Sequence, residues 1–192
     1  MTYKNSVVIT SANRTAVGSL GGSLKKIAGD ELGSKVISEA IKKSQLKNED
    51  IDEVVMGQVL TGGTGQNPAR QAAIRSGIPK EKPAYVVNQV CGSGIRSIAA
   101  GYQSIKTGDS KIIIAGGQES MSLAPHAIHL RDGKKLGDTH IIDTMIKDGL
   151  WDAFNGYHMG VTAENVAKKF QVTREEQDKF ALKSQEKALK AQ

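Results

Sequence analysis

The sequence contains little of several residue types that mark particular protein classes. Its 192 residues include one cysteine, so no disulfide can form within the chain. Aromatic residues make up 4%, and the 26 lysines and arginines are scattered, which disfavours nucleic-acid binding despite a net charge of +6. No apolar run approaches the roughly 20 residues of a membrane span, and residues 1–18 have neither the long apolar segment of a signal peptide nor an Arg-rich amphipathic presequence. These absences predict a cytoplasmic protein that binds neither nucleic acid nor membrane.

Four short apolar segments predict buried β-strands. They are Ser6–Thr10, Glu53–Gly57, Tyr85–Val90 and Lys111–Gly116, all rich in β-branched residues without strict alternation. Helical patterns connect them, over Glu31–Leu46 behind a possible Asp30 cap, after the pair Asn67 and Pro68, and after Cys91. This alternation predicts an α/β domain over residues 1–120, with a mostly parallel sheet and right-handed crossovers.

The pattern changes in residues 121–192. Residues 121–160 lack a regular period and hold all four histidines and the only tryptophan, and a stretch of this length in a compact chain is usually functional. His126 and His129 form an H-x-x-H pair without further ligands, which is weak support for a metal site. Two helices follow, the second opening with Thr173 and Glu176 in capping-box spacing. We expect residues 121–160 to be an insertion.

The only cysteine, Cys91, falls between the third predicted strand and the helix after it. At a helix N-terminus, free N–H groups and the positive end of the helix dipole favour a thiolate. Gly92, Ser93 and Gly94 leave room for a substrate carbonyl, and the N–H of Cys91 could face a developing oxyanion. A lone intracellular cysteine is more often a small buried residue, so position alone leaves both interpretations open.

The helix after Cys91 has two unlike faces. Small residues recur at Gly94, Ser97, Gly101 and Ser104, and large apolar or aromatic ones at Ile95, Ile98, Tyr102 and Ile105. Small residues let a second backbone approach closely, and large apolar ones require burial. We therefore expect this helix to be covered on both sides, by a layer that the visible chain does not supply.

Two phosphate-binding patterns are incomplete. Residues 92–97 carry the first two glycines of a dinucleotide-binding fingerprint between strand and helix, but Ser97 replaces the third glycine. Residues 57–63 begin like a phosphate-binding loop, but Gly63 stands where that loop requires lysine. Both interpretations are disfavoured.

Several longer motifs resemble the thiolase family. They are NQVCGSGIRSIAAGYQSI around Cys91, GQNPARQAA, AGGQESMSLAPH, IIDTMIKDGL and GYHMGVTAENVAKKF. The resemblance implies a layered α/β fold of two similar βαβαβαββ halves, of which this chain is the N-terminal one. Residues 1–120 then form the core of that half. Residues 121–192 form the inserted loop domain, which helps to bind coenzyme A and to assemble the enzyme, and the helices after it.

The resemblance also implies an activity, acetyl-CoA C-acetyltransferase. Cys91 matches the nucleophile that takes the acetyl group from acetyl-CoA as a thioester, before a second acetyl-CoA attacks it to give acetoacetyl-CoA. Leu150, His158 and Met159 match positions along the pantetheine channel. Coenzyme A thioesters are substrates here, so no cofactor or metal is expected, and the assembly is a homo-oligomer, a dimer or a tetramer. Residues 134–150 are closer to the biosynthetic branch than to the degradative one.

The family's remaining catalytic groups belong to the C-terminal half: the activating histidine, the cysteine base and most oxyanion donors. A transition state needs these groups together, so we expect the chain alone to be weak or inactive. Three hypotheses stay open: a portion that works with a complementary half, a product without activity, and a non-catalytic module that binds acyl-CoA or a partner. A ketoacyl synthase-type enzyme shares the nucleophile but normally lacks the GYHMG motif.

Overall fold

The computed structural model describes residues 6–191, and the chain divides into two compact units between Gly149 and Leu150. The first unit contains the parallel sheet and the second contains two long helices. The functional division expected at residue 120 does not coincide with this boundary and stays a prediction.

A parallel sheet of three strands forms the centre of the first unit. The middle strand β1 (Glu53–Gly57) pairs with β2 (Ala84–Val87) on one side and with β3 (Ile113–Gly117) on the other. β1 carries Val54, Val55 and Met56, which are at most 1% exposed, and continuous apolar strands of this kind are typical of sheets covered on both faces. Three of the four predicted strands and the parallel arrangement are therefore confirmed.

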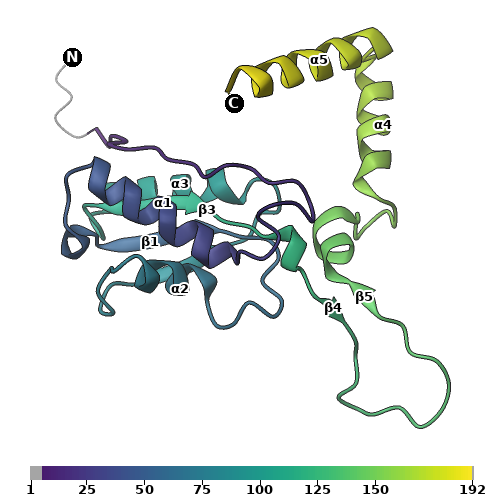
Figure 1. Ribbon diagram of the computed structural model, residues 1–192, viewed down its shortest axis with the longest axis horizontal. Helices are drawn as coiled ribbons and strands as arrows, with labels where there is room; N and C mark the ends of the chain where they lie inside the picture. Colours follow the sequence, from purple (N-terminus) through teal and green to yellow (C-terminus); the bar gives the residue numbers. More distant parts are fainter. Residues whose placement is uncertain (1–5, 192) are drawn as a thin grey trace. The chain divides into compact units, whose positions relative to one another are not determined.

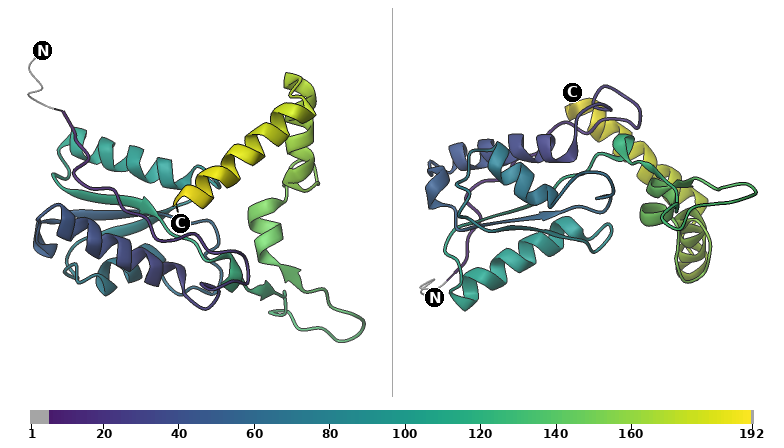
Figure 2. Two further views of the ribbon diagram at one scale, coloured as in Figure 1. Left: turned by 45° about the horizontal axis from the view of Figure 1, so that its top comes forward. Right: turned by 90° about the horizontal axis from the view of Figure 1, so that it is seen from below.

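Helices cover both faces of this sheet (Figures 1 and 2). α1 (Gly29–Lys43) and α2 (Pro68–Arg75) pack together on one face, and α3 (Ser93–Thr107) lies on the other. The apolar core lies between the sheet and the α1–α2 layer, and its most buried members are Ile37, Ile41, Ile51, Val54, Met56, Ala69, Ala72, Ala73 and Ile78. The predicted α/β layers are confirmed.

The starts of α1 and α2 show which capping predictions hold. Asn67 caps α2 as expected: its side chain accepts a hydrogen bond from the N–H of Arg70 at 3.1 Å, and Pro68 occupies the first helical position. The Asp30 cap is wrong, because α1 is capped by Ala28 and Asp30 lies in the first turn. The buried Asp30 carboxylate instead forms an ion pair with Arg75, at 2.6 Å, and the Arg75 side chain is half-exposed.

The strand predicted at Ser6–Thr10 is also wrong. This segment is irregular, and Val8 and Ile9 are 70% and 76% exposed. β-branched residues favour a strand only where a sheet edge supplies backbone partners. Here β1 is paired on both sides, and the segment pairs with neither edge strand, β2 or β3. Side-chain contacts such as Thr10 with Ser44, at 2.9 Å, hold it beside α1 instead.

Residues 118–150 leave the sheet and form a short antiparallel hairpin. After the 3₁₀ turn η2 (Met121–Leu123), β4 (His126–Ala127) pairs with β5 (Ile142–Asp143) across a long loop. A π-helical segment, η3 (Met145–Leu150), follows, with the Asp143 carboxylate accepting a hydrogen bond from the N–H of Met145 at 2.9 Å. A further 3₁₀ turn, η1 (Asn48–Asp50), precedes β1.

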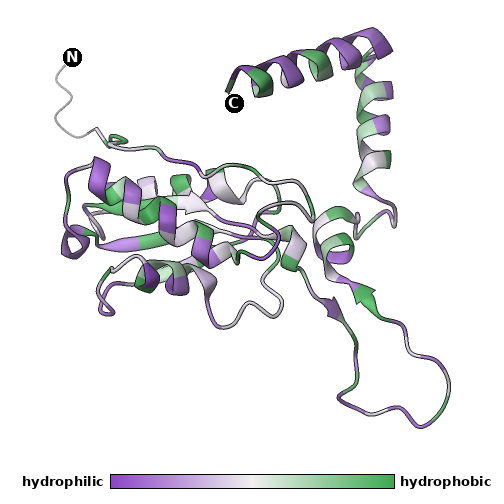
Figure 3. Cartoon of the chain, in the orientation of Figure 1, coloured by the Kyte–Doolittle hydropathy of each residue, from purple (hydrophilic) through white to green (hydrophobic). Residues whose placement is uncertain are grey.

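The second unit contains α4 (Met159–Phe170) and α5 (Arg174–Ala191). The expected capping box opens α5: the Thr173 N–H donates to the Glu176 carboxylate at 2.8 Å, and the Glu176 N–H donates to the Thr173 hydroxyl at 3.2 Å. Both helices have apolar side chains among polar ones (Figure 3) and no buried residue. Within residues 6–191, no helix combines the length and apolarity needed to cross a membrane.

Candidate active site

Cys91 lies in the turn that joins β2 to α3, where its thiol is exposed. Gly92 caps α3, and its carbonyl accepts a hydrogen bond from the N–H of Arg96 at 2.9 Å. The thiol therefore sits at the open N-terminal end of a 15-residue helix, as the sequence predicts. This exposure contradicts the alternative of a buried packing cysteine. The role as nucleophile stays a prediction.

The residue before Cys91 has an unusual backbone. Val90 has φ +49°, in the left-handed region that β-branched residues rarely adopt. The Val90 N–H donates to Asn88 Oδ1 at 2.9 Å, and the Val90 carbonyl accepts from the Ser93 hydroxyl at 2.6 Å. The Ser93 Oγ also accepts from the N–H of Gln89 at 2.8 Å. Side chains thus fix the turn on both sides of Val90.

Glycines allow the start of α3 to lie directly on the strand ends. A Cβ on Gly57 would lie 2.5 Å from the carbonyl carbon of Ser93 and 2.7 Å from the nitrogen of Gly94. At the end of β3, a Cβ on Gly117 would approach the Gly94 Cα at 3.6 Å. The position of Cys91 therefore depends on a backbone-to-backbone contact that no larger residue at position 57 permits.

The two faces of α3 have different surroundings. The small face meets the sheet: Ser97 is fully buried and its hydroxyl contacts the Gly116 carbonyl at 2.6 Å, while Gly101 lies against Ile113. The large apolar face points away from the sheet, with Ile95 78% and Tyr102 52% exposed. The structure confirms that both faces are distinct and shows that one is uncovered in this chain.

Glu119, just beyond β3, organises the loop that follows β1. Its carboxylate accepts hydrogen bonds from the N–H of Val59 at 2.8 Å and from that of Leu60 at 3.3 Å. Burial raises the pKa of the Glu119 carboxyl, and these backbone donors lower it only in part. The sequence analysis missed this residue. The available signal was an acidic residue directly after an apolar strand, where parallel strands place their functional loops.

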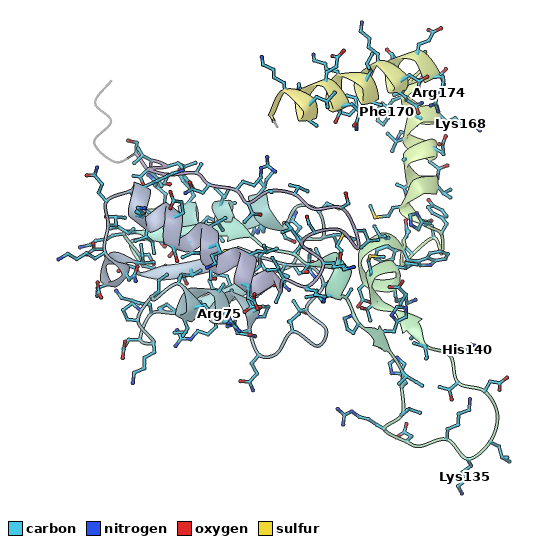
Figure 4. All side chains as sticks on the ribbon, in the orientation of Figure 1. Arg75, Lys135, His140, Lys168, Phe170 and Arg174 are labelled. Atoms are coloured by element: carbon cyan, nitrogen blue, oxygen red, sulfur yellow. The ribbon has the colours of Figure 1, made fainter. Side chains whose placement is uncertain are left out.

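Polar side chains that include Asp30, Gln58 and Arg75 line a cavity of about 310 Å³ beside these strand ends. Gln118 donates from Nε2 to Gln58 Oε1 at 2.9 Å, and both side chains are at most 7% exposed. Arg75, which projects from α2 (Figure 4), forms an ion pair with buried Asp30 in the same cavity wall. None of these pairings was predicted, because their partners lie tens of residues apart in the sequence.

The three predicted binding residues all belong to the second unit. His158 caps α4, its Nδ1 accepting from the N–H of Gly160 at 3.0 Å, and Met159 begins the helix with 38% exposure. Leu150 is half-buried at the end of η3. A bridge between Trp151 and His158 closes the intervening turn, and hydrogen bonds from Asn155 lower the pKa of Asp152 within it. Cys91 belongs to the other unit, so a joint site stays a prediction.

The other histidines form no metal-like cluster. His126 Nε2 lies 3.9 Å from Asp143 Oδ2 across the β4–β5 pair. His140 projects from the loop between these strands (Figure 4). Among residues 6–191, no group of three or more His, Cys, Asp or Glu side chains is arranged to hold a metal ion.

Cys91 is an exposed cysteine at the start of the helix that follows a parallel strand. Such a position suits acyl transfer by covalent catalysis. Comparison with known proteins shows the family to which the chain belongs. Residues 7–192 match the family model "Thiolase, N-terminal domain". The chain belongs to the thiolase family, and the resemblance drawn from its motifs is confirmed.

Three similar relatives are named acetyl-CoA acetyltransferase. The chain is 59% identical to one from Rhizobium meliloti and 57% identical to one from Cupriavidus necator, each over 97% of the chain and 48% of the relative. A relative from Rattus norvegicus named "Acetyl-CoA acetyltransferase, cytosolic" is 51% identical over 97% of the chain and 47% of its own length. The chain therefore spans about half the length of the curated relatives it matches.

Proposed function

We propose that this chain is the nucleophile-bearing portion of an acetyl-CoA acetyltransferase. The observation that carries the proposal is the exposed thiol of Cys91 in the turn before α3, inside the segment that matches the thiolase family. The names of the relatives supply the substrate class.

In the proposed first step, the Cys91 sulfur attacks the carbonyl carbon of acetyl-CoA. A carbon–sulfur bond to Cys91 forms, the bond to coenzyme A breaks, and the proton from the thiol leaves with coenzyme A as its free thiol. A second acetyl-CoA, deprotonated at its methyl carbon, then attacks the acetyl group. The bond between the acetyl group and the Cys91 sulfur breaks, acetoacetyl-CoA is released, and the proton removed from the methyl carbon returns to the sulfur, which restores the Cys91 thiol.

The second unit is proposed to bind the pantetheine arm of the substrates. Leu150, His158 and Met159 surround one turn that is closed by the Trp151–His158 bridge. Partly exposed apolar side chains at its edge suit the aliphatic part of such an arm. The hydrogen bond from the Gly160 N–H to His158 Nδ1 holds the ring in place. The other ring nitrogen, Nε2, takes no part in this bond and is available to a ligand.

We further propose that a C-terminal half completes the site and that the complete enzyme is a homo-oligomer. Support comes from the uncovered apolar face of α3, where Ile95, Ile98 and Tyr102 are 78%, 47% and 52% exposed. A contiguous apolar surface of this kind commonly marks an interaction site. The catalytic groups expected from that half would act on Cys91, and without them turnover is expected to be weak or absent.

Intact-mass spectrometry after incubation with acetyl-CoA tests the role of Cys91, with Cys91→Ser as the matched control. A gain of one acetyl group, about 42 Da, that disappears in the control supports the nucleophile. The absence of an adduct on the folded chain, both alone and with a complementary C-terminal half added, contradicts it. Saturable acyl-CoA binding without an adduct would instead favour the alternative of a non-catalytic acyl-CoA-binding fragment.

A further inference from the structure

The backbone of Val90 is held in a conformation that its side chain opposes. Its φ of +49° lies in the left-handed region, which costs a non-glycine residue free energy and persists only where surrounding groups impose it. The side chains of Asn88 and Ser93 bind the N–H and the carbonyl of Val90 at 2.9 Å and 2.6 Å, and they add to the backbone bond from the Ser93 N–H to the same carbonyl at 3.1 Å.

We infer that Ser93 and Asn88 are positioning residues for Cys91: they keep Val90 left-handed and thereby hold the thiol at the open end of α3. Ser93 is 4% exposed and is fixed by the close approach of α3 to Gly57. Its hydroxyl accepts a hydrogen bond from the N–H of Gln89 and donates one to the carbonyl of Val90. Asn88 holds the other end, and its Nδ2 lies 3.5 Å from the carbonyl of Val59.

The strained turn has a structural consequence for the thiol. An extended or right-handed Val90 would send the chain from β2 in another direction, so Cys91 would leave its place before the Gly92 cap. Cys91 would then no longer lie at the N-terminal end of α3, where the positive end of the helix dipole is. The two side chains therefore act on Cys91 through the backbone of Val90, without touching the sulfur.

The rate of alkylation of Cys91 by iodoacetamide tests this role. Cys91 is the only thiol in the chain, so the reaction reports on it alone. Asn88→Ala and Ser93→Ala are each expected to slow alkylation of the folded chain, by up to about five- to thirtyfold, the ratio that corresponds to the free-energy difference for a left-handed residue. Asn88→Asp keeps the acceptor for the Val90 N–H and is expected to retain a rate close to that of the parent.

A double variant separates positioning from general loosening. Glycine adopts positive φ freely, so Val90→Gly should make the Ser93 hydroxyl unnecessary. Ser93→Ala should then change the rate less than about twofold in the Val90→Gly background. Ser97→Ala is the matched control: it removes another short hydroxyl bond of α3, at 2.6 Å to Gly116, and should lower stability without slowing alkylation.

Three outcomes overturn the inference. The first is unchanged or faster alkylation in folded Asn88→Ala and Ser93→Ala. The others are that Ser93→Ala slows alkylation as much in the Val90→Gly background as in the parent, or that Ser97→Ala slows it as much as Ser93→Ala does. Circular dichroism identifies folded variants, and rates in denaturant correct for intrinsic reactivity. If Ser93→Ala unfolds, the alkylation rates of Asn88→Ala with and without Val90→Gly test the inference instead. Asn88 is exposed, so its replacement is expected to leave the chain folded. The inference rests on the proposed nucleophile, but alkylation uses no acyl-CoA, so a failure of the acetylation experiment is a separate result.

Discussion

Replacing Gly57 with alanine tests the contact on which the Cys91 turn rests. Gly57 ends the central strand, is paired with both Val87 and Gly117, and its carbonyl accepts the N–H of Gln118 at 2.9 Å. These hydrogen bonds hold β1 in place, so the strand cannot move away from α3. The new methyl group would lie 2.5 Å from the Ser93 carbonyl carbon, so α3 has to move away.

The expected size of the effect follows from this geometry. Ordinary contact begins near 3.4 Å, and forcing an extra methyl group into a packed interior costs about 1–3 kcal/mol. Alanine also restricts the unfolded chain, which offsets about 0.4–1 kcal/mol of that cost. A net loss of stability is therefore expected, and each 1 kcal/mol lowers Tm by about 2–4 °C in a domain of this size.

Urea unfolding followed by circular dichroism measures this loss. Gly94→Ala is the control, since a Cβ at Gly94 has no atom within 4 Å and alanine is favoured over glycine in a helix by about 0.5–1 kcal/mol. Gly57→Ala should destabilise the chain and Gly94→Ala should stabilise it. Equal stability of Gly57→Ala and the parent chain would refute the close packing of α3 on β1.

Three further predictions concern polar contacts. Because burial raises the pKa of Glu119 in the folded chain above the ordinary carboxyl value of 4.5, the folded state binds the proton more tightly. The stability of the parent relative to Glu119→Gln should therefore fall as pH rises from 4.5 through the raised value in urea titrations; a pH-independent difference would contradict this. Arg75→Ala should cost about 1–3 kcal/mol in urea unfolding by leaving buried Asp30 without its ion pair, whereas an unchanged midpoint would show the pair to be dispensable. Thr173→Ala should weaken the start of α5 by about 1 kcal/mol, seen as faster amide exchange in its first turn; unchanged exchange would argue against the capping box.

The sequence was informative for several local contacts, although the Asp30 cap shows that it was not so for all of them. Asn67 and Pro68 predict the start of α2, and Thr173 with Glu176 predicts the start of α5, because a capping hydrogen bond spans three residues. β1 was found because β-branched residues without alternation mark a buried strand. Cys91 stood out because it is the only cysteine and lies between a strand and a helix.

Contacts between distant segments were not predictable from the same patterns. Ser6–Thr10 has the composition of a strand, yet strand formation depends on pairing with another strand, and the segment pairs with neither edge strand of the sheet. Glu119 was missed because its partners, Val59 and Leu60, lie 60 and 59 residues away. The left-handed Val90 was missed because valine gives no local signal for positive φ. Such a conformation is imposed by its neighbours.

The two faces of α3 connect this packing to the proposed second half. Only the small face can meet the sheet, because the contact between Ser93 and Gly57 brings the two backbones too close for larger residues. Ile95, Ile98 and Tyr102 therefore point outward and stay largely exposed. Complete burial of one large apolar side chain stabilises by about 1.5–3 kcal/mol, while a whole domain is stable by about 5–15 kcal/mol. Covering this face would thus contribute a substantial share of the total stability, and a partner that docks here would hold the helix carrying Cys91 at its start.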